Sequence, residues 1–423
     1  MASALLLARD GHRVTLMERD HFDVGLPEDA PRWQRRGIPH FLQPHAFIPR
    51  GRKELREHLP DVYEALLAAG ARDVDLRPKL PGGDARDGDD HLQYLAVRRP
   101  LLEWALRRAV MNEPGIELCP AKRVDGLPDG LVVDALGRRS PTPGWLAEDN
   151  AATSDCGVVY YSRYYRQHSG FELPDGPWLL SPRGDLGYCA FATFPGDNGT
   201  FAALLAVPTG VAEWQVLRNA RAFDAAVAAI PALRLWVDPD GVDPITDVLP
   251  MAGLRNSLRR WDPERSSVVP VGDALSHTDP VLAHGLSFAL VHAVALLDTL
   301  RHGGNLSRYA EQVLPAARER YALATDLDEQ RHRMWTGGAV DPGRPDGDYA
   351  LFTMSAAAAV AMIDPDVFRV FVRRIGLLDP TSVLDDDAEL QRRIAERFNE
   401  LRRAPRPPGG PTRDEMVALT RQA

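Results

Sequence analysis

The 423-residue sequence has few cysteines and no long apolar segment. Its three cysteines, Cys119, Cys156 and Cys189, are widely spaced, so they offer neither a disulfide framework nor a C-x-x-C metal motif, and a reducing cytoplasm is the expected location. The first apolar run, ALLLA, ends at Arg9 and Asp10 and is too short for a signal sequence. No stretch approaches the ~20 apolar residues of a transmembrane helix.

Excess positive charge and several catalytic motifs are also missing. The net charge of −9 argues against a nucleic-acid-binding surface, and we expect no nucleic acid partner. The pairs Arg35-Arg36 and Arg98-Arg99 are candidate anion sites or simply solvated side chains. There is no H-x-x-x-H or H-E-x-x-H motif to indicate a metal and no G-x-S-x-G elbow to indicate a serine hydrolase.

What is present fits a soluble globular protein of two or three lobes, since 44% of the residues are hydrophobic and 26% are charged. The chain opens with MASALLLARDGHRVTLMERD. Residues 2–10 are predicted to form a helix, Gly11 to cap it, and HRVTLME to form a strand that ends at Glu18. A helix followed by a strand with an acidic end is the second half of a nucleotide-binding βαβ unit.

Periodicity predicts the other elements. Helices are expected over 53–71, 222–230, 286–301, 307–333, 353–376 and 386–403, and a strand followed by a helix within 94–112. Residues 157–206 contain short aromatic and β-branched runs separated by Gly, Pro and Asp, which predicts an antiparallel sheet. Residues 80–91 are expected to be an exposed loop, and 402–413 a flexible joint.

The segment SVVPVGDALSHTDPVLAHGLSFALVHAVAL, which starts at Ser267, is the most informative. It predicts a buried strand, a Gly-Asp turn, a loop and a helix, in which Asp273 can bond a polyol hydroxyl and the helix start can stabilise an anion. It resembles the signature G-D-A, a gap, then P-x-x-G-x-G-x-N of the flavoprotein hydroxylases and related FAD-dependent oxidoreductases. The resemblance implies that FAD is bound by Gly272, Asp273, Ala274, Pro280, Gly285, Leu286 and Ser287. The alternative is a structural strand, turn and helix with a capping Asp.

Two other segments follow the order of that family. Glu18 stands where a carboxylate accepts the ribose hydroxyls of FAD, and AVRRPLLEWAL resembles the stretch whose arginine approaches the flavin, with Arg99 the first candidate and Arg98 the second. The chain departs from the pattern at Ala283, where a loop glycine is usual, and at His292, where an Asp often sits.

The resemblance implies an α/β fold. We expect a glutathione-reductase-type, Rossmann-like FAD-binding domain that lacks its first strand, an inserted antiparallel β domain for the substrate, and a helical C-terminal region. The expected divisions are 1–55, 92–156 and 262–302 for FAD, 157–261 with 56–91 nearby for the substrate sheet, and 303–423 for the helices. The family's G-x-G-x-x-G turn would precede Met1, so either the start is assigned too late or the FAD site is degenerate.

Histidines provide candidates for catalysis. His45, in the loop GIPHFLQPHAF with His40, is predicted to position substrate or a peroxide oxygen, or to shuttle a proton. A histidine bonded to loop backbone is the alternative, and the same two interpretations hold for His277 and His284. The tyrosines between 160 and 165 either roof a substrate pocket or pack within a sheet.

The implied activity is that of an FAD-dependent oxidoreductase. We expect foremost a monooxygenase that hydroxylates or epoxidises an apolar or aromatic small molecule through a flavin hydroperoxide. NAD(P)H would supply the electrons, directly or through a partner flavin reductase, and Leu136 weakens direct NADPH binding because it replaces a polar family residue. The alternatives are a flavin dehydrogenase or reductase without oxygen insertion, and a truncated, non-enzymatic relative. The W-x-W-x-I-P stretch of flavin halogenases is not evident.

Overall fold

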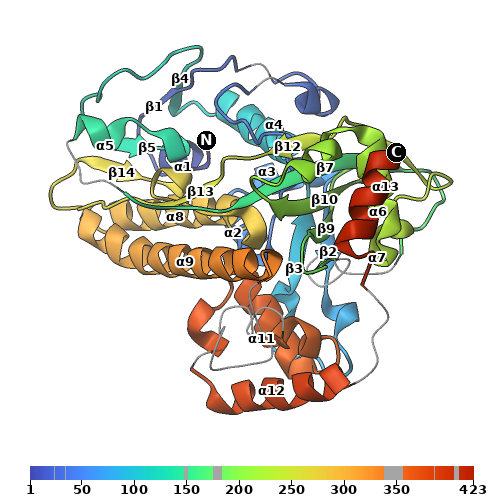
Figure 1. The fold of residues 1–423 in the computed structure, drawn as a ribbon. Helices are drawn as coiled ribbons and strands as arrows, with labels where there is room; N and C mark the ends of the chain where they lie inside the picture. Colours follow the sequence, from blue (N-terminus) through green and yellow to red (C-terminus); the bar gives the residue numbers. More distant parts are fainter. Residues whose placement is uncertain are drawn as a thin grey trace.

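The computed structural model describes residues 1–423 except 23, 34, 147–150, 175–182, 338–355, 385 and 404–408. Helices and sheets are mixed along the described chain, which confirms the α/β class (Figure 1). Among the helices in these ranges, none is both long enough and apolar enough to cross a membrane.

The parallel strands form two separate pairs. β1 (Val14–Met17) pairs with β4 (Ile116–Cys119), and β5 (Val132–Asp134) pairs with β14 (Val268–Pro270). Parallel neighbours need a crossover, and α4 (Arg99–Met111) lies in the connection from β1 to β4. The strand predicted to end at Glu18 is therefore confirmed as β1, which Glu18 follows directly.

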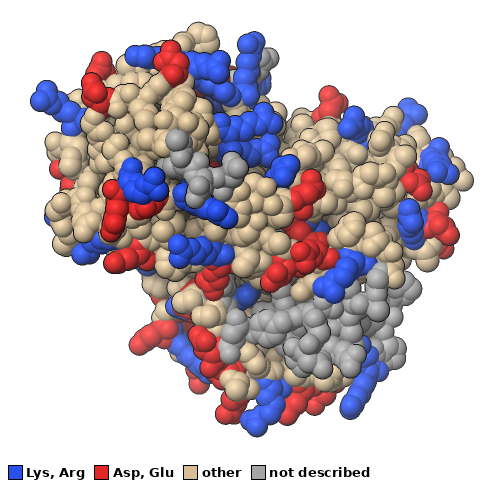
Figure 2. Space-filling view, turned by 60° about the vertical axis from the view of Figure 1, so that its left-hand side comes forward, with Lys and Arg blue, Asp and Glu red and all other residues tan. Residues whose placement is uncertain are grey.

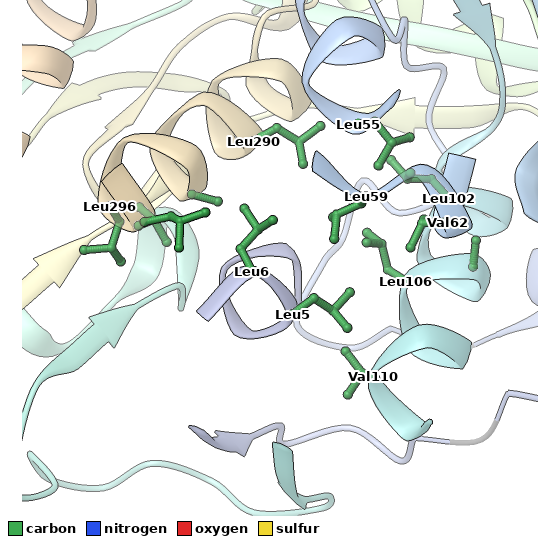
Figure 3. Close-up of a cluster of buried hydrophobic side chains, with 14 of the residues drawn as sticks. Leu5, Leu6, Leu55, Leu59, Val62, Leu102, Leu106, Val110, Leu290 and Leu296 are labelled. Carbon is green, nitrogen blue, oxygen red and sulfur yellow. The ribbon is translucent and has the colours of Figure 1, made fainter. Parts of the chain in front are cut away.

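Helices enclose the hydrophobic core beside these strands. It is built by α1 (Ala2–Arg9), α2 (Pro49–His58), α3 (Pro60–Ala68), α4 and α8 (Gly285–Arg301). Figure 3 shows Leu6 lying toward Leu290 of α8, and Leu5 toward Val110 of α4. Burial of each such side chain stabilises the fold by ~1.5–3 kcal/mol, and Leu5 and Leu6 thereby attach the first helix to α4 and α8.

The prediction of one continuous helix over 53–71 is wrong. The chain forms α2 and α3, which are separated at Leu59. Pro60 has no N–H to continue the α2 hydrogen bonds, but it suits the first turn of α3, where that N–H has no helical partner.

The predicted antiparallel sheet is confirmed. Its strands lie in the order β11 (Val242–Pro244), β7 (Val158–Gln167), β10 (Thr200–Pro208), β9 (Ala190–Pro195) and β8 (Arg183–Asp185), and β12 (Leu249–Met251) also pairs with β7. Side chains of Tyr161 and Tyr165 pack on one face, against a core that includes Phe223 of α6 (Ala220–Ala229). These two tyrosines therefore pack within the sheet.

The remaining described elements complete the arrangement in Figure 1. Two small antiparallel sheets join β2 (Arg72–Asp75) to β3 (Gln93–Ala96), and β13 (Arg255–Leu258) to both β6 (Ala152–Asp155) and β15 (Ser276–His277). Short helices are α5 (Thr142–Trp145) and α7 (Pro231–Arg234). The long α9 (Leu306–Trp335) lies beside α8, and α11 (Pro365–Ile375) and α12 (Ala388–Arg403) form a helical lobe. The last helix, α13 (Arg413–Gln422), packs on α6.

A buried group of charged side chains fastens α9 to the fold. Nη2 of Arg331 lies 2.5 Å from Asp279 Oδ2 and 2.5 Å from Asp328 Oδ1. The Tyr160 hydroxyl donates to Asp279 at 2.5 Å, and the Asn256 amide donates to Asp328 at 2.8 Å. Burial and the charge of Asp279 raise the pKa of Asp328 to about 8, whereas Arg331 overcomes burial and holds the pKa of Asp279 below its usual range.

The raised pKa of Asp328 predicts a pH-dependent stability. A carboxyl group with a higher pKa in the folded chain holds an extra proton there, so its contribution to the free energy of unfolding is lost as pH rises from about 4 through about 8. Asp328→Asn removes this titration. In denaturant unfolding between pH 5 and 8.5, we expect the native protein to lose stability more steeply than Asp328→Asn, and parallel curves would contradict the assignment.

The crossing of α2 and α8 depends on Gly51. A Cβ at Gly51 would lie only 3.3 Å from Cα of Ser287 and still closer to its side chain. Gly51→Ala is therefore expected to lower the free energy of unfolding by ~1–3 kcal/mol through overpacking, although alanine is ordinarily the better helix former. Gly144→Ala in α5 is the control, since nothing lies within 4 Å of its Cβ position. Equal effects in urea unfolding would refute the close approach.

Candidate functional site

The turn after β14 presents Asp273. Here the chain forms a short 3-10 helix, η6 (Gly272–Ala274), and Gly272 has a φ of +57°, a left-handed conformation that favours glycine. The N–H of Gly272 donates to Nδ1 of His292 at 3.0 Å. Burial lowers the pKa of His292 to about 3, which keeps this acceptor neutral. The histidine found in place of the usual Asp therefore holds the turn from α8.

The carboxylate of Asp273 lies at the start of α8. Its Oδ2 accepts a hydrogen bond from Nδ1 of His277 at 3.0 Å, and its Oδ1 lies 3.8 Å from the position of a Cβ on Gly285. Burial opposes ionisation, but the bond from His277 and the charge of Arg320 hold the pKa of Asp273 well below its usual range. The side chain is 29% exposed, so an ionised carboxylate is available to a ligand.

The predicted loop residues lead from this turn to α8. Pro280 begins a second 3-10 helix, η7 (Pro280–Leu282), and Ala283 follows with a φ of +56°. A side chain is strained in that left-handed region, which explains why glycine is usual at this place in the resembling family. Leu286 and Ser287 lie in the first turn of α8, where N–H groups have no helical acceptor. The hydroxyl of Ser287 is buried with no hydrogen-bond partner in the described chain.

Three histidines gather beside Asp273. The ring centroids of His40 and His45 are 6.0 Å apart, and those of His40 and His277 are 6.5 Å apart. Nδ1 of His45 donates to the carbonyl of Gln43 at 2.7 Å, which leaves Nε2 as an acceptor. Burial and the charge of Arg99 lower the pKa of His45 to about 3 and of His40 to about 4, so both rings are neutral at physiological pH.

Gln43 ties this histidine loop to the antiparallel sheet. Its side-chain amide donates to the carbonyl of Leu249 in β12 at 3.0 Å and accepts from the hydroxyl of Ser162 in β7 at 2.8 Å. Gln43 is buried, as is Ser162. These two bonds therefore hold the loop that carries His40 and His45 against the sheet.

Arg98 and Arg99 have different partners. Nη2 of Arg98 lies 2.6 Å from the buried carboxylate of Asp197, in the turn between β9 and β10. Nε of Arg99 donates to Glu103 at 2.9 Å, and its charge acts on both His40 and His45. Of the two predicted arginines, Arg99 is thus the one beside the histidines, whereas Arg98 joins α4 to the sheet.

At the end of β1, Glu18 is bound by Arg35. Glu18 Oε2 accepts from Nη2 of Arg35 at 3.0 Å, and Oε1 accepts from the N–H of Asp20 at 3.0 Å. Arg35 also lies 3.1 Å from Asp20 and 3.2 Å from Glu103. Because Glu103 binds Arg99 as well, a chain of alternating charges connects Glu18 with the histidines.

A cavity of about 360 Å³ opens beside Glu18 and is rich in arginine. Its lining is Arg19, Asp20, His21, Trp33, Arg35, Arg36 and Arg107. The guanidinium of Arg107 lies between two aromatic rings, 4.8 Å from Phe22 and 4.5 Å from Trp33. Lys and Arg side chains also gather on the upper half of the face in Figure 2. The Arg35-Arg36 pair therefore lines a cavity that suits an anionic, aromatic ligand.

One cluster has the composition of a metal site. Ligand atoms of Cys156, Asp279 and Asp328 lie within 4.8 Å of one another. Arg331 already binds both carboxylates, so a cation of the protein itself takes the place that a metal would need.

Comparison with known proteins finds similarity in the structure but none in the sequence searches. No family model and no curated protein matches this sequence. Its structure, however, is similar to pqsL, a probable FAD-dependent monooxygenase from Pseudomonas aeruginosa, with a TM-score of 0.53 and 16% identity over 79% of this chain and 95% of that one. The chain has the fold of the flavin-dependent monooxygenases.

Two other flavin proteins with this fold match more of the chain. The flavin-dependent brominase Bmp2 gives a TM-score of 0.57 at 16% identity over 95% of this chain and 96% of its own. A flavoprotein/dehydrogenase from Cytophaga hutchinsonii gives a TM-score of 0.62 at 12% identity, with the same two coverages.

The residues at both ends of the site fit FAD, the cofactor named for pqsL. Beside α8, Asp273 has an open oxygen, and Nε2 of His277 is buried without a partner among the described residues. At Glu18, each carboxylate oxygen accepts one bond and retains a second lone pair for a ribose hydroxyl. The adjoining cavity offers Trp33 and guanidinium planes against which an adenine ring can stack.

Proposed function

We propose that this protein is an FAD-dependent monooxygenase that acts on an apolar or aromatic small molecule. The observation that carries the proposal is the ionised carboxylate of Asp273 at the positive end of α8, bound to His277, whose Nε2 has no partner in the described chain. The fold supports it, and so does the probable FAD-dependent monooxygenase activity of pqsL.

The assignment of residues follows from their placement. The flavin and ribityl end of FAD would be held by the turn Gly272, Asp273 and Ala274 and by the loop residues Pro280, Gly285, Leu286 and Ser287, with Arg99 nearby. Glu18 would hold the adenosine end. Bound and reduced, FAD supplies the oxygen-activating chemistry. The first-turn N–H groups of α8 would stabilise negative charge there, and the antiparallel sheet would shield the histidine side from water.

The chain is also proposed to divide into an FAD-binding lobe, a substrate sheet and a helical region. The two parallel pairs, β1 with β4 and β5 with β14, support a glutathione-reductase-type FAD lobe formed by 1–55, 92–156 and 262–302. The sheet of 157–261 would bind substrate. The helices of 303–423 would cover part of the space between this sheet and the FAD lobe, except for α13, which lies on α6. NAD(P)H would provide the electrons, either directly or through a flavin reductase.

His45 is proposed to position the substrate or a peroxide group, accepting a hydrogen bond from its O–H on a neutral ring. Its Nδ1 proton is held by the carbonyl of Gln43, and burial keeps the ring uncharged, so Nε2 is the reactive atom. His45→Gln is expected to lower kcat about 10²- to 10⁴-fold with FAD affinity unchanged, and His12→Gln, at an exposed site, to leave both unchanged. Steady-state kinetics with bound-flavin absorbance test this, and full activity in His45→Gln would rule it out.

A flavin dehydrogenase or reductase is the second candidate, favoured by the similarity to the flavoprotein/dehydrogenase of Cytophaga hutchinsonii. Mass spectrometry of products formed under ¹⁸O₂ separates the two. Incorporation of one labelled oxygen atom per substrate supports the monooxygenase. Substrate oxidation or reduction without label, in a protein that binds FAD, supports the second candidate instead.

A further inference from the structure

Arg320 of α9 is a buried cation with little compensation. It is 5% exposed, its Nη1 donates to the carbonyl of Ser276 at 3.2 Å, and its guanidinium lies 4.9 Å from the ring of Phe288. Its Nε has no hydrogen-bond partner in the described chain. Burial lowers the pKa of Arg320 to about 10, and Asp273 opposes this only in part. A buried guanidinium with so few bonds is costly unless a ligand completes its surroundings.

The guanidinium is located where α8 begins. Nη2 of Arg320 lies 3.9 Å from the Cβ position of Gly285, and Oδ1 of Asp273 lies 3.8 Å from the same point. The first-turn N–H groups of α8 add positive potential there. Asp273 already pairs with His277, so one carboxylate faces a helix end, a guanidinium and a histidine.

This residual positive potential indicates a site for a delocalised anion. Oxidised isoalloxazine is neutral, whereas its reduced form carries negative charge at the N1–C2=O edge. On the basis of the function proposed above, we propose that Arg320 makes this site prefer reduced over oxidised flavin. The ring of Phe288 and the carbonyl of Ser276 orient the guanidinium, and its charge reaches the ligand across the start of α8.

Arg320→Met removes the charge and keeps the length of the side chain, and Arg320→Lys keeps the charge. Arg318→Met is the matched control, because Arg318 is exposed two residues earlier on the same helix. Equilibrium dialysis with FAD, in air and under anaerobic dithionite reduction, gives the Kd of each form. In Arg320→Met we expect the Kd of reduced FAD to rise about tenfold more than that of oxidised FAD, because a unit charge is lost near an anion. Arg320→Lys should retain most of the preference, and Arg318→Met all of it.

Equal weakening of both oxidation states in Arg320→Met overturns the inference, since it shows a structural role alone. Arg320→Gln, which is smaller, provides the same comparison if the Met variant does not fold. If the native protein binds neither form of FAD, the function proposed above fails together with this inference. Native binding with an unchanged ratio in the variants refutes only the role of Arg320.

Discussion

Asp273→Ala is expected to weaken FAD binding by about 10- to 100-fold. A hydrogen bond to a charged group contributes ~1.5–3 kcal/mol, which corresponds to that range in Kd. The carboxylate is ionised, partly exposed and placed at the start of α8, so its loss removes the acceptor proposed for a ribityl hydroxyl. The loss also leaves Nδ1 of His277 without its partner.

Two variants sharpen this test. Asp273→Asn keeps the shape and one acceptor oxygen, so an intermediate Kd is expected. Asp298→Asn, near the other end of α8, loses a half-exposed carboxylate bound by Arg308 and should leave FAD affinity unchanged. Fluorescence titration with FAD measures all three. A Kd for Asp273→Ala within twofold of the native value would contradict the assignment.

Arg331→Met is expected to lower the free energy of unfolding by ~3–5 kcal/mol. Arg331 binds two buried carboxylates, and removal of one partner of a buried ion pair leaves the other charge uncompensated. Asp279 also accepts the N–H of Val281 in η7, so the damage extends to the loop that leads into α8. Urea unfolding followed by circular dichroism measures the effect.

The ionised carboxylate of the group provides the control for this prediction. Asp279→Asn in the Arg331→Met background removes the stranded charge, because the raised pKa of Asp328 keeps that side chain protonated at neutral pH. It should recover part of the loss, a coupling that a double-mutant cycle detects. Arg318→Met, at an exposed position of the same helix, should change stability by less than ~0.5 kcal/mol. An unfolding free energy for Arg331→Met close to that of Arg318→Met would show that the buried group is not a stabilising anchor.

Local signals predicted the parts of the fold that depend on neighbouring residues. Periodicity predicts the helix and strand before Glu18, and it predicts α8. Turn chemistry predicts the turn at Gly272 and Asp273. Each of these signals comes from residues close together in the sequence. Pro60 was the available signal for the break between α2 and α3, since proline cannot continue a helix.

Partners far apart in sequence were not predictable in the same way. Arg35, which binds Glu18, and Asp197, which binds Arg98, are brought together only by tertiary folding. The sequence around Arg320 and Arg331 does contain a signal that these arginines are buried. They fall on the same helical face as Ala317 and Ala324, which are buried, and a charged residue on an apolar stripe indicates a buried ion pair or a ligand.

Calorimetric titration of FAD into the native and Asp273→Ala proteins decides whether this chain binds FAD through Asp273. The native protein is expected to saturate at one FAD per chain, whereas Asp273→Ala is expected to stay largely unbound at the same concentrations. No binding by the folded native protein, or equal binding by the two proteins, would show that Asp273 is not part of an FAD site.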